Sequence, residues 1–116
     1  MKQVIINPTK VIEAYKECAL WASKIDELTI YDILPSLSQK MDSDVISFLN
    51  DMQTWLRMSG LNESEIGHSL WLTQNHHGAG FFDYSIDQNI IDTLTDRAHK
   101  IGEYNLFINE QNHICI

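Results

Sequence analysis

Apolar residues recur every three or four positions in three stretches of the chain, which is the spacing of one buried face of an α-helix. The first stretch covers residues 7–25 and opens with an Asn-Pro pair, a favourable start for a helix. Trp21 shares its helical spacing, so we expect this side chain in the core; an exposed Trp21 would instead be a candidate interface anchor. The next segment, 29–41, contains a proline and is predicted to be a short helical turn and a loop. The apolar face of the first helix comprises Val11, Tyr15, Cys18, Ala22 and Ile25.

The second and third helices are bounded by residues that favour helix ends. Asp42 or Ser43 caps the second helix by accepting backbone N–H bonds, and Gly60 ends it in a left-handed conformation. Ser85 or Asp87 caps the third helix, which ends before the glycine at position 102. The apolar face of the second helix comprises Val45, Phe48, Leu49, Met52, Trp55 and Leu56, and that of the third Ile90, Ile91, Leu94, Ala98 and Ile101.

Four shorter stretches are rich in strand-forming residues. Two of them flank the polar sequence NHHGA and predict one hairpin, and the other two flank NEQN and predict a second. The sequence NESEIGH, just before the first hairpin, is predicted to form a single helical turn. The strands are expected at 69–74, 80–85, 104–108 and 113–116. The pattern therefore predicts one α+β domain over residues 1–116, with an antiparallel sheet of about four strands (two hairpins) packed by three helices.

The first predicted hairpin contains the sequence WLTQNHHGAGFF, residues 71–82, and turn chemistry accounts for most of it. Gly78 supplies the turn, and Gly80 lets the chain pass close to a neighbour. Phe81 and Trp71 pack across the hairpin as an aromatic pair, while polar side chains on either side of the turn satisfy its N–H groups. The residues assigned to this structural or interaction role are Trp71, Asn75, His77, Gly78, Gly80 and Phe81.

The same stretch also permits a catalytic interpretation. Histidine titrates near neutral pH, so His68, His77 and Asp83 form a candidate acid/base set, with Thr73 or Ser69 as a hydroxyl nucleophile. No nucleophile motif accompanies these residues. The adjacent histidines at 76 and 77 lack zinc-ligand spacing, and the two cysteines form no CxxC pair. We predict no metal site and no cofactor.

Two segments carry a resemblance to a known family. AYKECALWAS, residues 14–23, and GHSLWLTQNHHGAGFFD, residues 67–83, resemble a family of small uncharacterised bacteriophage proteins with the patterns AYxECALWSS and GHDFWLTRNxHGAGFWDR. A helix and a closing segment like GEYNLFINEQNHICI follow in the same order, so the resemblance covers most of the chain. It implies a phage origin and no particular reaction. The matching positions of the central motif are Gly67, His68, Trp71, Leu72, Thr73, Asn75, His77, Gly78, Ala79, Gly80, Phe81 and Asp83, and His76 falls at the variable position.

Three positions depart from the family pattern. Ser69 stands where the pattern has Asp, and Gln74 and Tyr84 stand where it has Arg. Without the two guanidinium groups an anion-binding or phosphate-handling site is less well supported. Without a carboxylate at position 69, His68 lacks a natural orienting partner.

Charge narrows the possible functions. The formal net charge is -8. Most of it comes from residues 58–116, which contain eight acidic residues and only two basic ones, Arg97 and Lys100. Direct binding to nucleic acid needs clustered basic residues, so we expect none. No apolar run is long enough for a membrane span, and MKQVIINPTK lacks the apolar core of a signal peptide. The sequence therefore predicts a cytoplasmic protein without a membrane partner.

These observations predict a small acidic bacteriophage accessory protein of the host cytoplasm, which binds and occludes a host or defence protein without catalysis. Its partner presents a basic surface, and Asp92 and Asp96, one helical turn apart, lie on the acidic face that meets it. The alternative is a small enzyme or ligand-binding protein with its site around the NHHGAGF hairpin. A homodimer, paired through the final strand or exposed tryptophans, is a third possibility. The expected acidic face comprises Glu63, Glu65, Asp87, Asp92 and Asp96.

Overall fold

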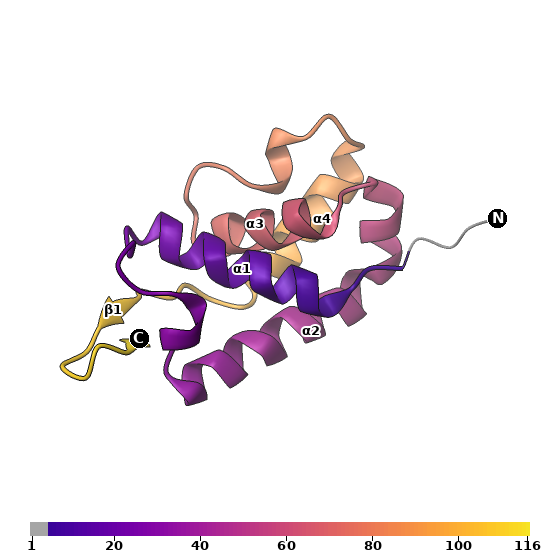
Figure 1. Ribbon diagram of the computed structural model, residues 1–116. Helices are drawn as coiled ribbons and strands as arrows, with labels where there is room; N and C mark the ends of the chain where they lie inside the picture. The colour runs from indigo at the N-terminus through magenta and orange to yellow at the C-terminus, as the bar shows by residue number, and fades with distance from the viewer. Residues whose placement is uncertain (1–4) are drawn as a thin grey trace.

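The protein is mainly helical in the computed structural model, which describes residues 5–116 (Figure 1). The sequence predicted no signal peptide in MKQVIINPTK, and the first four residues of that segment lie outside the described part. The helices are α1 (Pro8–Ala22), α2 (Pro35–Ser59), α3 (Glu63–Gln74) and α4 (Gln88–His99), with 3-10 turns η1 (Ile30–Asp32) and η2 (Phe81–Asp83). Two short strands follow, β1 (Phe107–Ile108) and β2 (Ile114–Cys115). In Figure 1, α1 and α3 lie side by side and run in the same direction, and α2 runs the opposite way.

The predicted α+β fold with a four-stranded sheet is wrong. Residues 69–74, expected as a strand, form the second half of α3, and 80–85 form a 3-10 turn and a loop. Within residues 5–116 the sheet is limited to one antiparallel pair of two-residue strands. Three helices were expected, and the described residues form four.

Burial on nearly every side explains why α3 was mistaken for a strand. Its start carries a capping box, in which Asn62 accepts from the Glu65 N–H and Glu65 accepts from the Asn62 N–H. Beyond that start, its neighbours also bury polar positions such as Ser69, Thr73 and Gln74, so the one-sided apolar stripe of a surface helix is lost. Ser-Leu-Trp-Leu-Thr-Gln is also rich in strand-forming residues, which favoured the wrong assignment. The buried residues of α3 are Ile66, Gly67, Ser69, Leu70, Trp71, Thr73 and Gln74.

A glycine allows α3 to pack closely on α1. A Cβ atom built on Gly67 would lie 2.6 Å from the Val11 carbonyl oxygen, 2.7 Å from the Ala14 Cβ and 2.8 Å from the Tyr15 nitrogen. Distances this short are not tolerated between non-bonded atoms, so the two backbones could not approach this closely with any larger residue. Farther along the pair, the Tyr15 hydroxyl donates to Gln74 Oε1 over 2.6 Å. This close contact fixes which α1 and α3 side chains share a surface.

The predicted helix ends are partly confirmed. The first helix begins where its pattern placed it but ends at Ala22, so Ile25, expected on its apolar face, lies after the helix. Gly60 ends α2 with φ 73°. The predicted start of that helix at 42–43 is wrong, because Pro35 occupies its first turn and Leu37 and Met41 are already buried in it. Asp87 caps α4 by accepting from the Asn89 N–H.

The second predicted hairpin is confirmed, although its strands are shorter than expected. Phe107 pairs with Cys115 and Ile108 with Ile114, around the tight turn after Asn109. The Ile114 carbonyl also accepts from the Leu34 N–H at 2.9 Å, so β2 is bonded on both sides at this residue. The hairpin is thereby attached to the start of α2.

The buried side chains form one cluster between the four helices. Phe48 of α2 stacks on Phe81 of η2, with ring centroids 5.9 Å apart, and Trp71 of α3 meets Tyr15 of α1 edge to face at 5.5 Å. Each pair joins residues far apart in sequence, so the aromatic contacts hold the helices and the η2 segment together. Within residues 5–116, no helix combines the length and the apolar character that crossing a membrane requires.

Candidate functional site

The two adjacent histidines of the central motif form the C-terminal cap of α3. His76 adopts a left-handed conformation with φ 55°, which ends the helix. Its N–H donates to the Thr73 carbonyl, and the His77 N–H donates to the Leu72 carbonyl over 3.0 Å. This pair of bonds is the Schellman arrangement, which satisfies the last carbonyls of a helix. The motif is therefore a helix end and not a hairpin turn.

Behind this cap the chain returns along α3 and is attached to it through Thr73. The Thr73 hydroxyl oxygen accepts from the Phe81 N–H over 3.2 Å, and the Gly80 N–H donates to Asp83 Oδ2 over 2.9 Å. A Cβ atom on Gly80 would lie 2.1 Å from Thr73 Oγ1, and Gly80 has φ 145°, so glycine is required here for two reasons. Thr73 is only 3% exposed. The candidate nucleophile thus acts as a buried structural acceptor.

Trp71 is buried and Asn75 is half-buried. Trp71 is 1% exposed and contacts the rings of Tyr15 and Tyr104, so it does not pair with the aromatic residue at position 81. The Asn75 side chain donates to the Trp71 carbonyl and accepts from the Tyr104 N–H over 2.7 Å. Both candidate interaction residues therefore join α3 to the segment after α4.

The three histidines at positions 68, 76 and 77 are distributed over two regions. His77 and Gly78 are exposed beyond the end of α3, and His76 stacks on His99 with ring centroids 4.3 Å apart. His68 is exposed on α3 between that helix and the η2 segment, where it lines a cavity with Asp83. Among residues 5–116, no group of three His, Cys, Asp or Glu side chains is arranged to hold a metal ion. Of the proposed acid/base set, only His68 and Asp83 share a surface.

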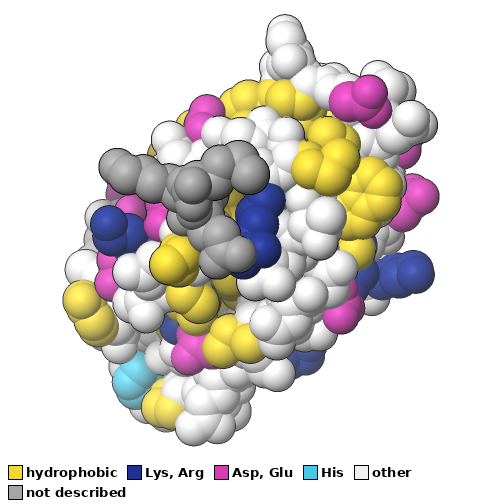
Figure 2. Space-filling view, turned by 90° about the vertical axis from the view of Figure 1, so that its right-hand side faces the viewer, with side chains coloured by type: hydrophobic (Ala, Val, Ile, Leu, Met, Phe, Trp, Pro, Cys, Tyr) yellow, Lys and Arg dark blue, Asp and Glu magenta, His cyan; other side chains and the backbone are white. Residues whose placement is uncertain are grey.

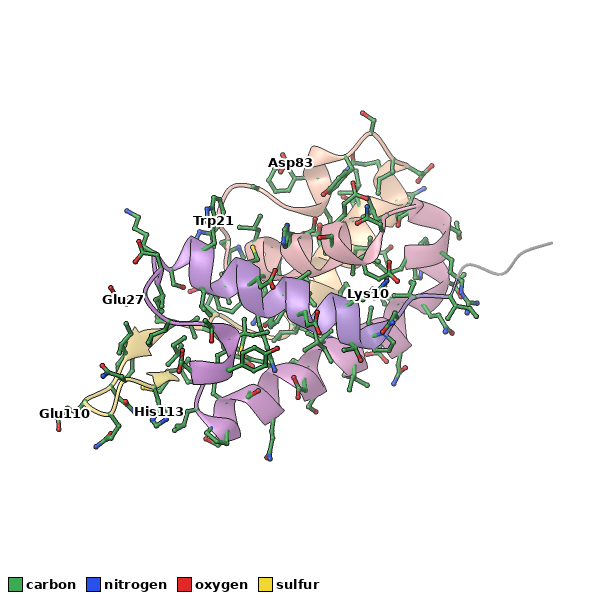
Figure 3. All side chains as sticks on the ribbon, viewed as in Figure 1. Lys10, Trp21, Glu27, Asp83, Glu110 and His113 are labelled. Atoms are coloured by element: carbon green, nitrogen blue, oxygen red, sulfur yellow. The ribbon has the colours of Figure 1, made fainter. Side chains whose placement is uncertain are left out.

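This cavity, which we call the α1–α3 cavity, has a volume of about 500 Å³. It lies between the C-terminal half of α1, the exposed side of α3 and the η2 segment. Figure 3 shows Trp21 near the end of α1 and Asp83 on the segment above α3. Glu17 and Trp21 stand one helical turn apart, so both project from the same side of α1. The lining residues are Glu17, Cys18, Trp21, His68, Ser69, Leu72, Gly80, Asp83 and Tyr84.

The α1–α3 cavity is acidic and partly aromatic. Within residues 5–116, no ion pair involves Glu17 or Asp83, and no Lys or Arg lines the cavity. Burial raises the pKa of the Cys18 thiol to about 11, and the thiol donates to the His68 carbonyl over 3.7 Å. The thiol is therefore protonated at neutral pH and is a poor nucleophile there. The arrangement favours binding of a cation over covalent catalysis.

A second hollow, which we call the acidic groove, lies between the end of α2 and the start of α4. Trp55, Met58 and Ile90 provide apolar surface, and three carboxylates lie beside it. Met58 is 60% exposed. No ion pair within the described residues involves these carboxylates. Figure 2 views the molecule from this end, where exposed hydrophobic side chains lie among separate acidic and basic groups. The groove is lined by Trp55, Met58, Asp87, Asn89, Ile90, Asp92, Thr93 and Asp96.

The structure divides the acidic face that the sequence predicted. Asp92 and Asp96 both line the acidic groove, together with the α4 cap Asp87. Glu65 instead belongs to the capping box of α3. Glu63 accepts from the Asn7 N–H over 3.1 Å, and this hydrogen bond lowers the pKa of its carboxyl group. Only the three aspartates therefore share one hollow.

Sequence reasoning missed several residues of the two hollows. Trp21 was expected in the core and is 74% exposed. Glu17 received no role, although its four-residue spacing from Trp21 already put the two on one side of α1. Trp55 was assigned to the core face of its helix and is half-buried beside the acidic groove.

The two segments from which a bacteriophage family was predicted, residues 14–23 and 67–83, meet at the α1–α3 cavity. They provide every lining residue except Tyr84, the neighbour of the second segment. Two of the three departures from the family pattern, Ser69 and Tyr84, line the cavity. The third, Gln74, is fully buried and bonds the Tyr15 hydroxyl and the Gly102 carbonyl. No family model, no curated protein and no solved structure matches the chain.

Proposed function

We propose that this chain is a non-enzymatic bacteriophage accessory protein that binds a host or defence protein in the host cytoplasm and occludes a basic surface of it. The acidic groove carries this proposal. It combines apolar side chains with three carboxylates that form no ion pair with a Lys or Arg of residues 5–116. Protein interfaces commonly have this arrangement, with an apolar centre and a polar rim.

Electrostatics gives this groove a preferred partner. Asp92 and Asp96 face the solvent from one side of α4, in a chain of formal net charge -8. Their field accelerates association with a surface rich in Lys and Arg and disfavours acidic surfaces. Met58 and Trp55 beside them supply apolar contact, and both residue types are enriched at interfaces. Occlusion of a basic surface is the consequence of such a contact.

The catalytic alternative retains little of its proposed set. Thr73 and Asn75 are engaged in structural hydrogen bonds, and His77 lies outside the α1–α3 cavity. His68 and Asp83 share that cavity, which favours ligand binding there over the proposed four-residue catalytic set. The non-enzymatic function is the one we retain.

The test is capture of a partner from bacterial host lysate by the purified protein, followed by native mass spectrometry and measurement of affinity. The variant Asp92→Asn/Asp96→Asn removes two charges from the groove. Glu27→Gln/Glu110→Gln is the matched control, because it removes the same charge at the other end of the molecule (Figure 3). We expect the groove variant to bind the captured protein about threefold to tenfold more weakly, at about 0.3–0.7 kcal/mol for each of the two charges, and to show a weaker salt dependence.

The control should bind like the unmodified protein. Equal loss in the two variants would show that only total charge matters, and unchanged binding in the groove variant would refute the role of the groove. A captured protein that binds equally well at high salt would contradict the electrostatic mechanism.

A further inference from the structure

We propose that the α1–α3 cavity is a binding site for a small organic ammonium ion with a flat apolar body. This site is separate from the acidic groove, so it goes beyond the proposed function and does not depend on it. Its volume of about 500 Å³ lies within the range of small-molecule sites. The cavity also has the combination usual for such sites, an apolar lining with a few polar groups that converge on it.

Charge decides the class of ligand. Glu17 and Asp83 reach the cavity from two different elements, α1 and η2, and no described Lys or Arg lines it. Asp83 Oδ2 is held by the Gly80 N–H, which fixes the position of its carboxylate. Two carboxylates without a cation attract a positively charged ligand and repel an anion.

The aromatic side chains decide the shape of the ligand. Trp21 is 74% exposed at the cavity, one turn from Glu17, and Tyr84 lies in the opposite segment. An indole face attracts a cation and also stacks against a flat apolar ring. Leu72 adds aliphatic surface between them. A protonated amine on an aromatic or heteroaromatic ring satisfies both requirements.

The experiment uses three compounds with the same ring and different charge: tryptamine, tryptophol and indole-3-propionate. Each is titrated into the isotope-labelled protein at physiological salt, and backbone amide shifts are followed by NMR. We expect tryptamine to bind most tightly and indole-3-propionate most weakly, with the largest shifts at residues 17–21, 68–72 and 80–84. The affinities of the two extremes should differ by about tenfold or more, because both the carboxylates and the indole face favour the cation.

Variants separate the charge from the apolar contact. Glu17→Gln should weaken the binding of tryptamine about threefold and leave that of tryptophol unchanged, because it removes one exposed charge and little volume. Trp21→Ala should weaken the binding of both compounds. Glu110→Gln, which removes one charge at the far hairpin, should leave the binding of both unchanged. Both mutated side chains at the cavity are exposed, so the variants should remain folded.

Three results would overturn the proposal. These are equal binding of the three compounds, shifts located away from the cavity, and no binding at millimolar concentration. A fourth result, equal effects of Glu17→Gln and Glu110→Gln, would also overturn it, because tryptamine binding would then respond only to net charge. None of these results bears on the acidic groove, so this proposal and the proposed function can fail separately.

Discussion

Replacing Thr73 with Val removes one oxygen atom from the link between α3 and the η2 segment and nearly preserves the side-chain shape. In the structure this oxygen accepts from the Phe81 N–H over 3.2 Å. Thr73 is 3% exposed and Phe81 is fully buried, so water has little access to the bond. The substitution therefore leaves a buried N–H group without its acceptor.

The expected loss follows from that unpaired group. A buried donor without a partner costs about 1–3 kcal/mol, whereas the nearly equal volume of Val leaves no cavity. Phe81 also stacks on Phe48, with ring centroids 5.9 Å apart, and this contact restricts how far the segment can move to regain a bond. The free energy of unfolding should fall by about 1–3 kcal/mol, which lowers Tm by about 4 °C per kcal/mol in a domain of this size.

Urea denaturation followed by circular dichroism measures the loss, and amide hydrogen exchange locates it. The Phe81 amide should exchange faster in the variant than in the unmodified protein. Thr93→Val is the matched control, since the Thr93 hydroxyl only donates to the Asn89 carbonyl within α4. This change should alter the free energy of unfolding by less than about 0.5 kcal/mol.

The reasoning fails if Thr73→Val and Thr93→Val have the same effect. It also fails if the Phe81 amide keeps its exchange rate while stability falls, because the loss would then come from another part of the structure. A variant too unstable to purify can be replaced by Thr73→Ser. This change keeps the oxygen and should lose only about 1 kcal/mol for the missing methyl group.

Three further predictions concern the packing of α1 against α3 and the burial of Cys18 in α1. Gly67→Ala should lower the free energy of unfolding by about 1–3 kcal/mol in urea denaturation, because the alanine Cβ would lie within 2.8 Å of α1 atoms. A gain in stability of about 1 kcal/mol, as at an exposed helix position, would refute the close packing. Cys18 should react with iodoacetamide at a rate that still rises between pH 9 and 11, because burial raises the pKa of its thiol to about 11. Peptide mass spectrometry measures the alkylation of Cys18, and a rate that levels off below pH 9 would contradict the burial. The same shift makes folding less favourable as pH rises from about 9 toward 11, since the unfolded chain loses the proton first.

The sequence alone determined those elements whose cause is local. The first helix, the Gly60 end of α2 and the Asp87 cap of α4 depend on helical spacing and on the conformational preferences of single residues. The pairing of residues 107–108 with 114–115 depends on a short turn and was also predictable. The acidic character of α4 was visible in the spacing of its aspartates.

Tertiary structure decided α3 and both hollows. Ser69–Gln74 becomes helical because the capping box starts a helix and Gly67 lets it pack on α1, where polar groups such as Gln74 find partners far along the chain. Such partners leave no periodic pattern in the sequence, so the buried helix resembled a strand. Glu17 and Asp83 meet in one cavity for the same reason. Their proximity depends on the packing of α1, α3 and the η2 segment, which no local preference specifies.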